Sequence, residues 1–495
     1  MTSPTIALCA LVGYFLTLLI IARLTGKDAD NETFFRGNKK SPWPVVAFGM
    51  IGASLSGVSF VSVPGYVGHT HMTYLQMCIG FFFGYLAVAF ILLPIYYRMN
   101  LTSIYSYLQD RFGTTSRQTG AAFFILSKLA GAAVRFYLVC MVLQQIVFEP
   151  FGIPYPLTVI IILLLVWLYT RRAGIRTLVY TDALQTFCLI GAIIAVVTII
   201  SRQMYPSWQS MTQAVSQSPL SRIFVWDDWT SRQYFWKQFL SGIFIVIVMT
   251  GLDQDMMQKN LTCPTLRKAQ KDMCSYGICF VPVNLLLLLI GVLLYTYAGQ
   301  NNIAIPADGD QLFPMLVLDG HFGHAVTVLF TLGISAAAFS SIDSALTALT
   351  TTFCVDILNI DKTPSSPKAV NRRKAVHLGI TISFILLTVL FRLVGNGSVI
   401  DMIYVLASYT YGPLLGLFAF GIFTHHKLKE RYAPFIAIAS PLVCYALSVI
   451  VPHYTGYHFG YELLMLNGTL TFLLLYAVRT HPRMPLKTSS NNQPT

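Results

Sequence analysis

The sequence predicts an all-α membrane protein with about thirteen transmembrane helices. The 495-residue chain is 55% hydrophobic and only 11% charged, whereas a soluble chain normally carries about 25% charged residues. Runs of roughly 20 apolar residues, each long enough to cross a bilayer as a helix, recur along almost its whole length. The basic residues also fall on alternate loops, as they do in a polytopic protein.

Hydropathy places the expected spans in order along the chain. They lie near residues 5–24, 44–66, 73–97, 119–147, 156–170, 176–201, 236–257, 271–298, 323–357, 374–393, 398–421, 433–450 and 460–478. The first span has no basic region before it and no small-residue cleavage site. We therefore expect a retained helix with its N-terminus outside. Residues 1–480 then form one transmembrane domain, and 481–495 form a disordered cytoplasmic tail.

The distribution of basic residues supports this topology. Alternating loops place 26 of the 33 Lys and Arg residues on the cytoplasmic side, while Lys128 and Arg135 fall within a span. This is the positive-inside rule for a bacterial inner membrane. The net charge of +13 therefore reports topology and predicts no nucleic-acid partner. The sequence has no Walker A loop, HExxH motif or Ser/His/Asp arrangement within the spans, which argues against an ATP-driven pump and an enzyme.

Two spans are interrupted. The stretch "VVAFGMIGASLSGVSFVSVPGYV" (45–67) is broken by Gly49, Gly52 and Gly57 with serines between them, and "FLSGIFIVIVMTGLDQDMMQKN" (239–260) is interrupted at Thr250–Gly251. Glycine and hydroxyl residues lower helix stability and let backbone carbonyls turn away from the axis. Ordinary glycine packing between helices is the alternative explanation.

The two interrupted spans are five spans apart and so cross the membrane in opposite directions. Broken helices at matching positions of two inverted halves indicate the central site of a transporter. The two five-helix halves are 44–201 and 236–421, with 5–24 and 433–478 as additional helices.

The ninth span carries a polar face formed by Ser340, Asp343, Ser344 and Thr347, which are spaced i, i+3, i+4, i+7. Asp182 in the sixth span lies at comparable depth. Converging hydroxyl and carboxylate oxygens suit a hard cation such as sodium. Two unpaired carboxylates would repel, and a bound cation would relieve that repulsion. One carboxyl could instead be protonated, or each could pair with a separate base. Interhelical hydrogen bonding would explain the serines but not Asp343.

Several stretches resemble the sodium:solute symporter family, which includes bacterial proline, galactose and sialic acid symporters, and resemble the sialic acid group most. They are "GASLSGVSFVSVPG", "GIRTLVYTDALQ", "GLDQDMMQ" and "AAAFSSIDS…TTFCVDI". The resemblance covers about residues 1–480. It implies a 5+5 inverted-repeat fold of the leucine-transporter type, sodium-coupled alternating access, a small-molecule solute and function as a monomer in the lipid bilayer.

The resemblance also implies one or two sodium sites. The ligands of the first are the carbonyls of Gly52, Leu55 and Ala337 and the hydroxyls of Ser340 and Ser341. The positions that match a second, deeper site are Asp182, Ser340, Asp343 and Ser344. The family usually has Ser or Thr where this chain has Asp343, which is therefore expected to be a charged ligand of a second cation or a proton site.

Arg135 is the main indication of the solute. Lys128 lies near the cytoplasmic third of its span and is expected to snorkel, but Arg135 is deeper and must face a partner or an aqueous cavity. Arginine suits bidentate capture of a carboxylate, and the sialic acid symporter resembles this chain in having arginine there. We therefore favour a carboxylate-bearing solute, with sialic acid the leading candidate. A purely structural pairing of Arg135 is the alternative.

Four further residues are expected to face the solute: Ser54, Ser56, Ser59 and Gln76. Val246 and Met249 stand where the galactose symporter has polar contacts, which speaks against a galactose-like binding mode. A sodium symporter for a neutral sugar, polyol or amino acid is the alternative within the family, since fold alone decides little about the substrate. A passive channel or a membrane sensor is the alternative from another class, although the short tail after residue 480 leads us to expect no output domain.

Overall fold

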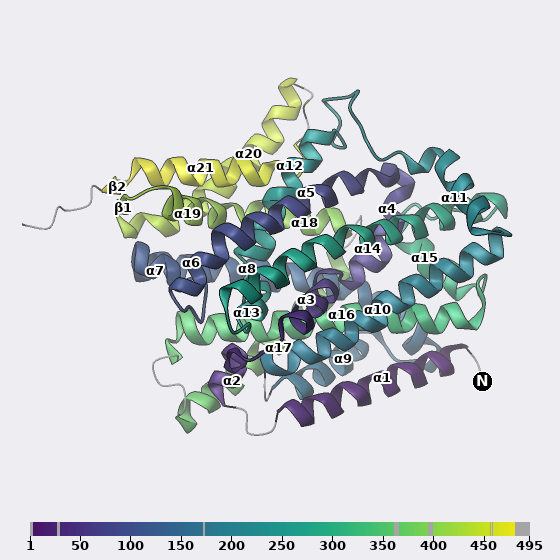
Figure 1. Cartoon of the computed structure of the whole chain (residues 1–495), viewed down its shortest axis with the longest axis horizontal. Helices are drawn as coiled ribbons and strands as arrows, with labels where there is room; N and C mark the ends of the chain where they lie inside the picture. The colour runs from purple at the N-terminus through teal and green to yellow at the C-terminus, as the bar shows by residue number, and fades with distance from the viewer. Residues whose placement is uncertain are drawn as a thin grey trace, which may run out of the picture.

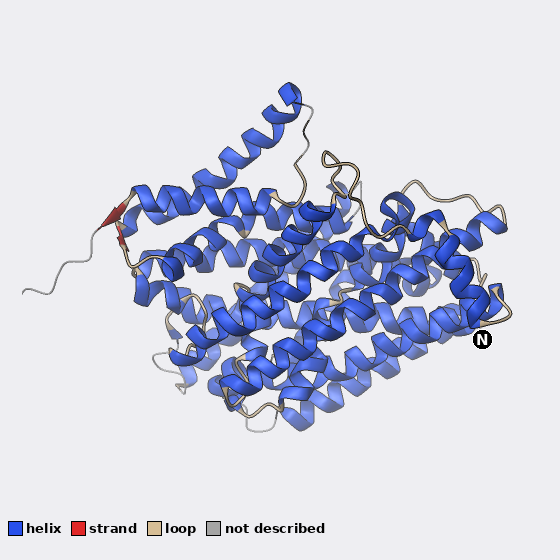
Figure 2. Ribbon diagram, turned by 45° about the horizontal axis from the view of Figure 1, so that its top comes forward, coloured by secondary structure: helices blue, strands red, loops and turns tan. Residues whose placement is uncertain are grey.

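The computed structural model describes residues 3–26, 30–171, 174–360, 366–394, 399–455, 457 and 459–480. The tail predicted for residues 481–495 lies outside this part of the chain. The described chain is helical almost throughout, apart from one short antiparallel pair of strands (Figure 2). These strands are β1 (Lys427–Leu428) and β2 (Arg479–Thr480).

The helices alternate between long spans and short connecting pieces. In the first half they are α1 (Ser3–Thr25), α2 (Asn31–Arg36), α3 (Trp43–Ser54), α4 (Gly57–Thr70), α5 (Tyr74–Ala87), α6 (Leu93–Arg98), α7 (Ser106–Arg111), α8 (Thr114–Leu143), α9 (Tyr155–Thr170), α10 (Ile175–Met204) and α11 (Trp208–Gln217). In the second half they are α12 (Phe235–Val246), α13 (Gln254–Asn260), α14 (Leu266–Gln300), α15 (Leu312–Leu318), α16 (Gly323–Thr352), α17 (Pro367–Val394), α18 (Val399–Thr410), α19 (Gly412–Phe423), α20 (Ala433–Thr455) and α21 (Leu463–Ala477).

The lengths and composition of these helices confirm a multi-pass membrane protein. Within the described residues, 8 helices are long and apolar enough to cross a bilayer, or up to 10 if each of two bent pairs is one span. Three shorter apolar helices, α3, α9 and α21, accompany them. Each of the expected spans overlaps one or more of these helices. Large apolar side chains on the outer surface, such as those of Phe187, Leu386 and Leu442, are exposed as a lipid-facing surface requires.

The helices form one bundle around α16. The most apolar 18-residue stretch of α16 is 78% buried, against 22% for those of α17 and α20. At one edge of the bundle, α1 packs on α10 and α16, and at the opposite edge α21 packs on α19 and α20 (Figure 1). The first helix and the last helix therefore flank a core that contains α3, α4, α8 and α10.

The first predicted interruption is present, and it falls between α3 and α4. Leu55 leaves helical geometry with φ −80° and ψ 82°, and Ser56 is extended before α4 begins. Gly49 and Gly52 lie within the regular helix of α3. A Cβ atom at Gly52 would collide with Thr186 Oγ1. These two glycines therefore allow α3 to pack closely on α10, as the packing alternative proposed, while the break itself lies three to four residues after Gly52.

The second interruption is also present. The π-helical turn η7 (Ile247–Gly251) ends α12, and α13 then runs at 69° to it. The Asp253 side chain caps α13, because its Oδ1 accepts a hydrogen bond from the Asp255 backbone N–H at 2.9 Å. Every residue of α13 is buried. The polar sequence after the break is therefore turned into the bundle.

Candidate functional site

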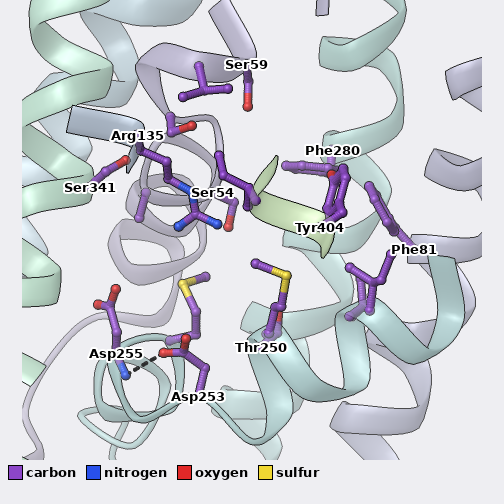
Figure 3. A pocket seen from close by; sticks show the side chains of 18 of the residues that line it. Ser54, Ser59, Phe81, Arg135, Thr250, Asp253, Asp255, Phe280, Ser341 and Tyr404 are labelled. Atoms are coloured by element: carbon purple, nitrogen blue, oxygen red, sulfur yellow. Dashed lines mark hydrogen bonds between the residues drawn. The ribbon is translucent and has the colours of Figure 1, made fainter. Parts of the chain in front are cut away.

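A cavity of about 110 Å³ lies between the two broken helices. The structure brings four of the five predicted solute-binding residues to its wall, and these are Ser54, Ser56, Ser59 and Arg135. They come from the α3–α4 break and from α8, and the facing wall comes from α12, η7 and α14. These four residues therefore share one cavity, which Figure 3 shows from close by.

Arg135 presents an unused cation to this cavity. Its side chain extends toward Ser54, above the carboxylates of Asp253 and Asp255 (Figure 3). Across the described segments, no hydrogen bond or ion pair joins the Arg135 guanidinium to another residue. A guanidinium inside a membrane protein requires either a partner or water. Its five donors in a planar fork are therefore available to a bound anion.

Aromatic rings form much of the opposite wall. Phe81, Tyr85, Tyr276 and Phe280 belong to α5 and α14, and the rings of Tyr85 and Tyr276 lie 4.4 Å apart. The Tyr276 hydroxyl hydrogen-bonds with those of both Ser54 and Tyr85. These hydrogen bonds link the α3–α4 break to α14. The cavity consequently has one cationic, hydroxyl-rich side and one apolar side.

Gln76 does not reach the cavity. Its amide Nε2 donates to the carbonyls of Thr73 (3.2 Å) and Gln233 (3.0 Å), and its Oε1 accepts from the Val225 backbone N–H at 3.1 Å. These bonds hold the loop between α11 and α12 against the start of α5. The structure therefore separates Gln76 from the other predicted solute-binding residues.

Lys128 does not snorkel, and that prediction was wrong. Its side chain is 8% exposed, and its ammonium lies 2.7 Å from Asp255 Oδ2 and 3.1 Å from Asp253 Oδ2. The Tyr411 hydroxyl donates to Asp253 as well, at 2.6 Å. The two acids that follow the second break hold the lysine inside, because a buried ammonium is stable only when it is paired. This cluster forms the floor of the cavity.

The helices that carry the predicted ligands of the first sodium site meet where the α3–α4 break faces α16. A Cβ atom at Gly57, which starts α4, would lie 3.6 Å from the Ile334 carbonyl, one turn before Ala337. Ser341, one turn after Ala337, lines the same cavity as Ser54 and Ser56. Both α3 and α4 pack against α16, so the helices that carry the five predicted ligands are in contact.

Hydrogen bonds already orient two of these ligands. The Ser341 hydroxyl donates to the Ala337 carbonyl at 3.0 Å, and the Ser340 hydroxyl donates to Asp182 Oδ1 at 2.8 Å. Gly52 donates its backbone N–H to Thr186 Oγ1 at 3.1 Å, which fixes this part of α3 on α10. The set supplies carbonyl and hydroxyl oxygens alone, which is the donor chemistry of a hard monovalent cation.

The predicted second sodium set is divided by the structure. Asp182 and Ser340 are bonded to each other, whereas Asp343 accepts a hydrogen bond at Oδ2 from the Tyr169 hydroxyl at 2.6 Å. Asp343 Oδ1 and Ser344 Oγ are buried and have no hydrogen-bond partner in the described part of the chain. Of the alternatives considered for these acids, pairing with a base is the one found at Asp182.

That partner is Lys259, which the sequence placed in a cytoplasmic loop. Its ammonium lies 2.8 Å from Asp182 Oδ2 and 3.8 Å from Asp255 Oδ1. The seventh span predicted from hydropathy ends at residue 257, so Lys259 falls outside it in the predicted topology. A local signal did exist, because Asp255 and Lys259 are spaced i, i+4 and would share a helical face. Asp182, which lies 77 positions away in the chain, could not be assigned as its partner from spacing.

The fold and this site define a polytopic membrane transporter with two broken helices around a central cavity. A family model for the sodium:solute symporter family matches residues 34–433. The chain belongs to this family. It is therefore a sodium-coupled symporter rather than an enzyme, and sodium is its coupling ion.

Relatives and solved structures agree with this assignment. The chain is 24% identical to the sodium/sialic acid symporter SiaT of Proteus mirabilis over 83% of this chain and 84% of the relative. It is 25% identical to the sodium-dependent multivitamin transporter of Oryctolagus cuniculus over 76% of this chain and 59% of that protein. It shares its fold with a sodium-coupled sialic acid symporter solved in a substrate-bound outward-open state, with a TM-score of 0.80, 21% identity and coverage of 95% and 97% of the two chains.

Proposed function

We propose that this symporter imports a carboxylate-bearing solute, with sialic acid the leading candidate, by sodium-driven alternating access across the bacterial inner membrane. The observation that carries the proposal is the Arg135 guanidinium, which lines the central cavity and makes no hydrogen bond or ion pair among the described residues. A solute carboxylate would supply the two acceptor oxygens that this fork is shaped to bind. The sialic acid symporters among its relatives support the same solute.

The other cavity residues would contact different parts of the solute. Ser54, Ser56 and Ser59 would donate hydrogen bonds to hydroxyl or amide groups of the solute, and the aromatic rings would pack on its apolar parts. The apolar side chains of Val246 and Met249 also line the cavity. They offer no hydrogen bonds on the α12 side, which argues for a solute recognised mainly at its carboxylate end.

We propose that one sodium ion binds between the α3–α4 break and α16, held by Gly52, Leu55, Ala337, Ser340 and Ser341. The same break supplies the serines of the solute cavity, so ion and solute would favour the same closed arrangement of these helices. Such a shared preference is sufficient for coupling, because coupling is a reciprocal free energy between two sites. Of the second set, Asp343 and Ser344 retain free oxygens for a further ion.

The proposed topology is thirteen crossings, with the N-terminus outside and the C-terminus in the cytoplasm. The inverted repeats would be residues 44–201 and 236–421, each beginning with one of the two broken helices. The placement of α1 and α21 at opposite edges of the bundle supports their assignment as additions to this core (Figure 1). We propose that a monomer is the functional unit.

The test is uptake of radiolabelled sialic acid into proteoliposomes that contain the purified full-length protein. We expect an inward sodium gradient to drive accumulation above the external concentration, and a potassium gradient to drive none. Uptake that stops at equal concentrations would identify a passive carrier and contradict the proposal. Sodium-stimulated uptake of galactose, mannitol or proline, without any uptake of sialic acid, would favour the neutral-solute alternative.

A further inference from the structure

Lys259 places a fixed positive charge against Asp182 in the middle of the bundle. The two side chains are 2% and 1% exposed, and 2.8 Å separates the ammonium nitrogen from Asp182 Oδ2. The other oxygen of this carboxylate, Oδ1, accepts the Ser340 hydroxyl hydrogen at 2.8 Å. Both oxygens of Asp182 are therefore already in contact with a donor that the protein itself provides.

The position of Lys259 follows from the second helix break. Because α13 turns 69° away from α12, it runs within the bundle, and its last turn delivers the lysine to α10. The neighbouring acids are largely occupied elsewhere. Lys128 lies 2.7 Å from Asp255 Oδ2 and 3.1 Å from Asp253 Oδ2. Asp182 is consequently the nearest acidic partner of Lys259, since Asp255 is 3.8 Å from its ammonium.

A sodium ion at Asp182 would compete with this arrangement. Sodium binds through oxygen lone pairs, and the ammonium group stands beside the Asp182 oxygen that Ser340 leaves uncovered. An ion placed at this carboxylate would also lie next to a like charge, in an interior where such repulsion is strong. Asp343 differs in its direct contacts, because its Oδ1 has no hydrogen-bond partner in the described part of the chain and its Oδ2 accepts a hydrogen bond from the neutral Tyr169 hydroxyl.

We propose that the Lys259 ammonium is a built-in cation that permanently occupies the place a sodium ion would take at Asp182. Asp182 is then not a sodium ligand in this chain. The lysine holds α13 to α10 throughout the transport cycle, whereas a sodium ion at that position would bind and dissociate. The inference rests on the proposed function, in which sodium drives transport, and narrows which residues bind it.

Counting bound sodium tests the inference without any solute. Equilibrium binding of ²²Na⁺ to the purified full-length protein would be compared for the wild type, Lys259→Met and the double variant Lys259→Met/Asp182→Asn. Methionine keeps the length of the lysine stem and removes its charge. We expect Lys259→Met to bind one more sodium ion per chain than the wild type, because Asp182 is uncovered. The double variant should return to the wild-type number.

Asp182→Asn alone keeps the test decisive if Lys259→Met does not fold, as judged by its thermal unfolding in detergent. The isosteric amide should leave the number of bound sodium ions unchanged. Loss of one sodium ion in Asp182→Asn, or an unchanged number in folded Lys259→Met, would overturn the inference. A failed uptake assay would overturn the proposed function alone, because these counts do not depend on solute transport.

Discussion

The two ends of the central cavity carry the same kind of charge in opposite situations. Lys128 and Arg135 lie seven residues apart on α8 and line the same space. At the floor, Lys128 is enclosed by two carboxylates, and above it Arg135 has no partner in the described chain. The comparison teaches that a buried charge is a scaffold when its partners come from the protein, and a binding group when they are missing.

Removing the charge of Lys128, at the paired end of the cavity, should lower the thermal stability most. Lys128→Met leaves Asp253 and Asp255 buried next to each other without their shared cation. Breaking a buried pair in this way costs about 3–5 kcal/mol. We therefore expect the midpoint of thermal unfolding in detergent to fall by more than in any other single variant described below.

The control for this prediction restores the charge balance in part. Lys128→Met combined with Asp255→Asn should recover some of the lost thermal stability, because one uncompensated carboxylate is removed. An unfolding midpoint equal to that of the wild type in Lys128→Met would mean that the ion cluster is not a scaffold.

The unpaired end should dominate affinity for the solute. Arg135→Ala removes the proposed carboxylate ligand at a cost of about 2–4 kcal/mol, or roughly 30- to 1,000-fold in kcat/KM. Its unfolding midpoint should stay close to that of the wild type. Arg135→Lys keeps the charge but loses the fork, so its transport should be intermediate. If Arg135→Ala lowers stability but leaves the KM for sialic acid unchanged, Arg135 has a structural role and does not bind the solute.

The sodium ligands should give a smaller and different effect. Ser341→Ala removes one of five proposed ligands, and we expect about a tenfold increase in the sodium concentration that half-saturates uptake, which is about 1.4 kcal/mol. Ser335→Ala on the same helix is the matched control and should leave that concentration unchanged. If both variants need the same sodium concentration for half-saturation, Ser341 is not a sodium ligand.

Gln76 should give the smallest effect on the solute. Because its amide is engaged with the backbone of Thr73, Val225 and Gln233, Gln76→Leu should change the KM for the solute by less than about twofold. Its three lost hydrogen bonds should lower thermal stability instead, by about 1–3 kcal/mol. A tenfold increase in KM at unchanged stability would return Gln76 to the binding site.

Features encoded within a single span were predicted well from the sequence. The break near Leu55 follows from a local run of glycine and serine, and the burial of Asp343 follows from the apolar residues around it. Arg135 was placed correctly because its depth in one helix already excludes lipid.

Features that depend on contacts between helices were missed. The ion pair between Lys259 and Asp182 requires the 69° turn at Leu252–Asp253, which brings a polar, seemingly cytoplasmic segment inside. Lys128 was misplaced for the same reason, since its partners follow that turn. A glutamine such as Gln76 gives no sign in the sequence of whether its hydrogen bonds face a cavity or a loop.

The hydrogen bond from Ser340 to Asp182 has a consequence for the ion itself. A hydroxyl has one hydrogen and two lone pairs, and here the hydrogen is committed to the carboxylate at 2.8 Å. Ser341 likewise commits its hydrogen, to the Ala337 carbonyl at 3.0 Å. The hydroxyl oxygens of Ser340 and Ser341 therefore present only lone pairs to a bound ion. In the proposed first sodium site, these two hydroxyl dipoles are therefore already aligned, so a sodium ion bound there would lose little free energy to their reorientation.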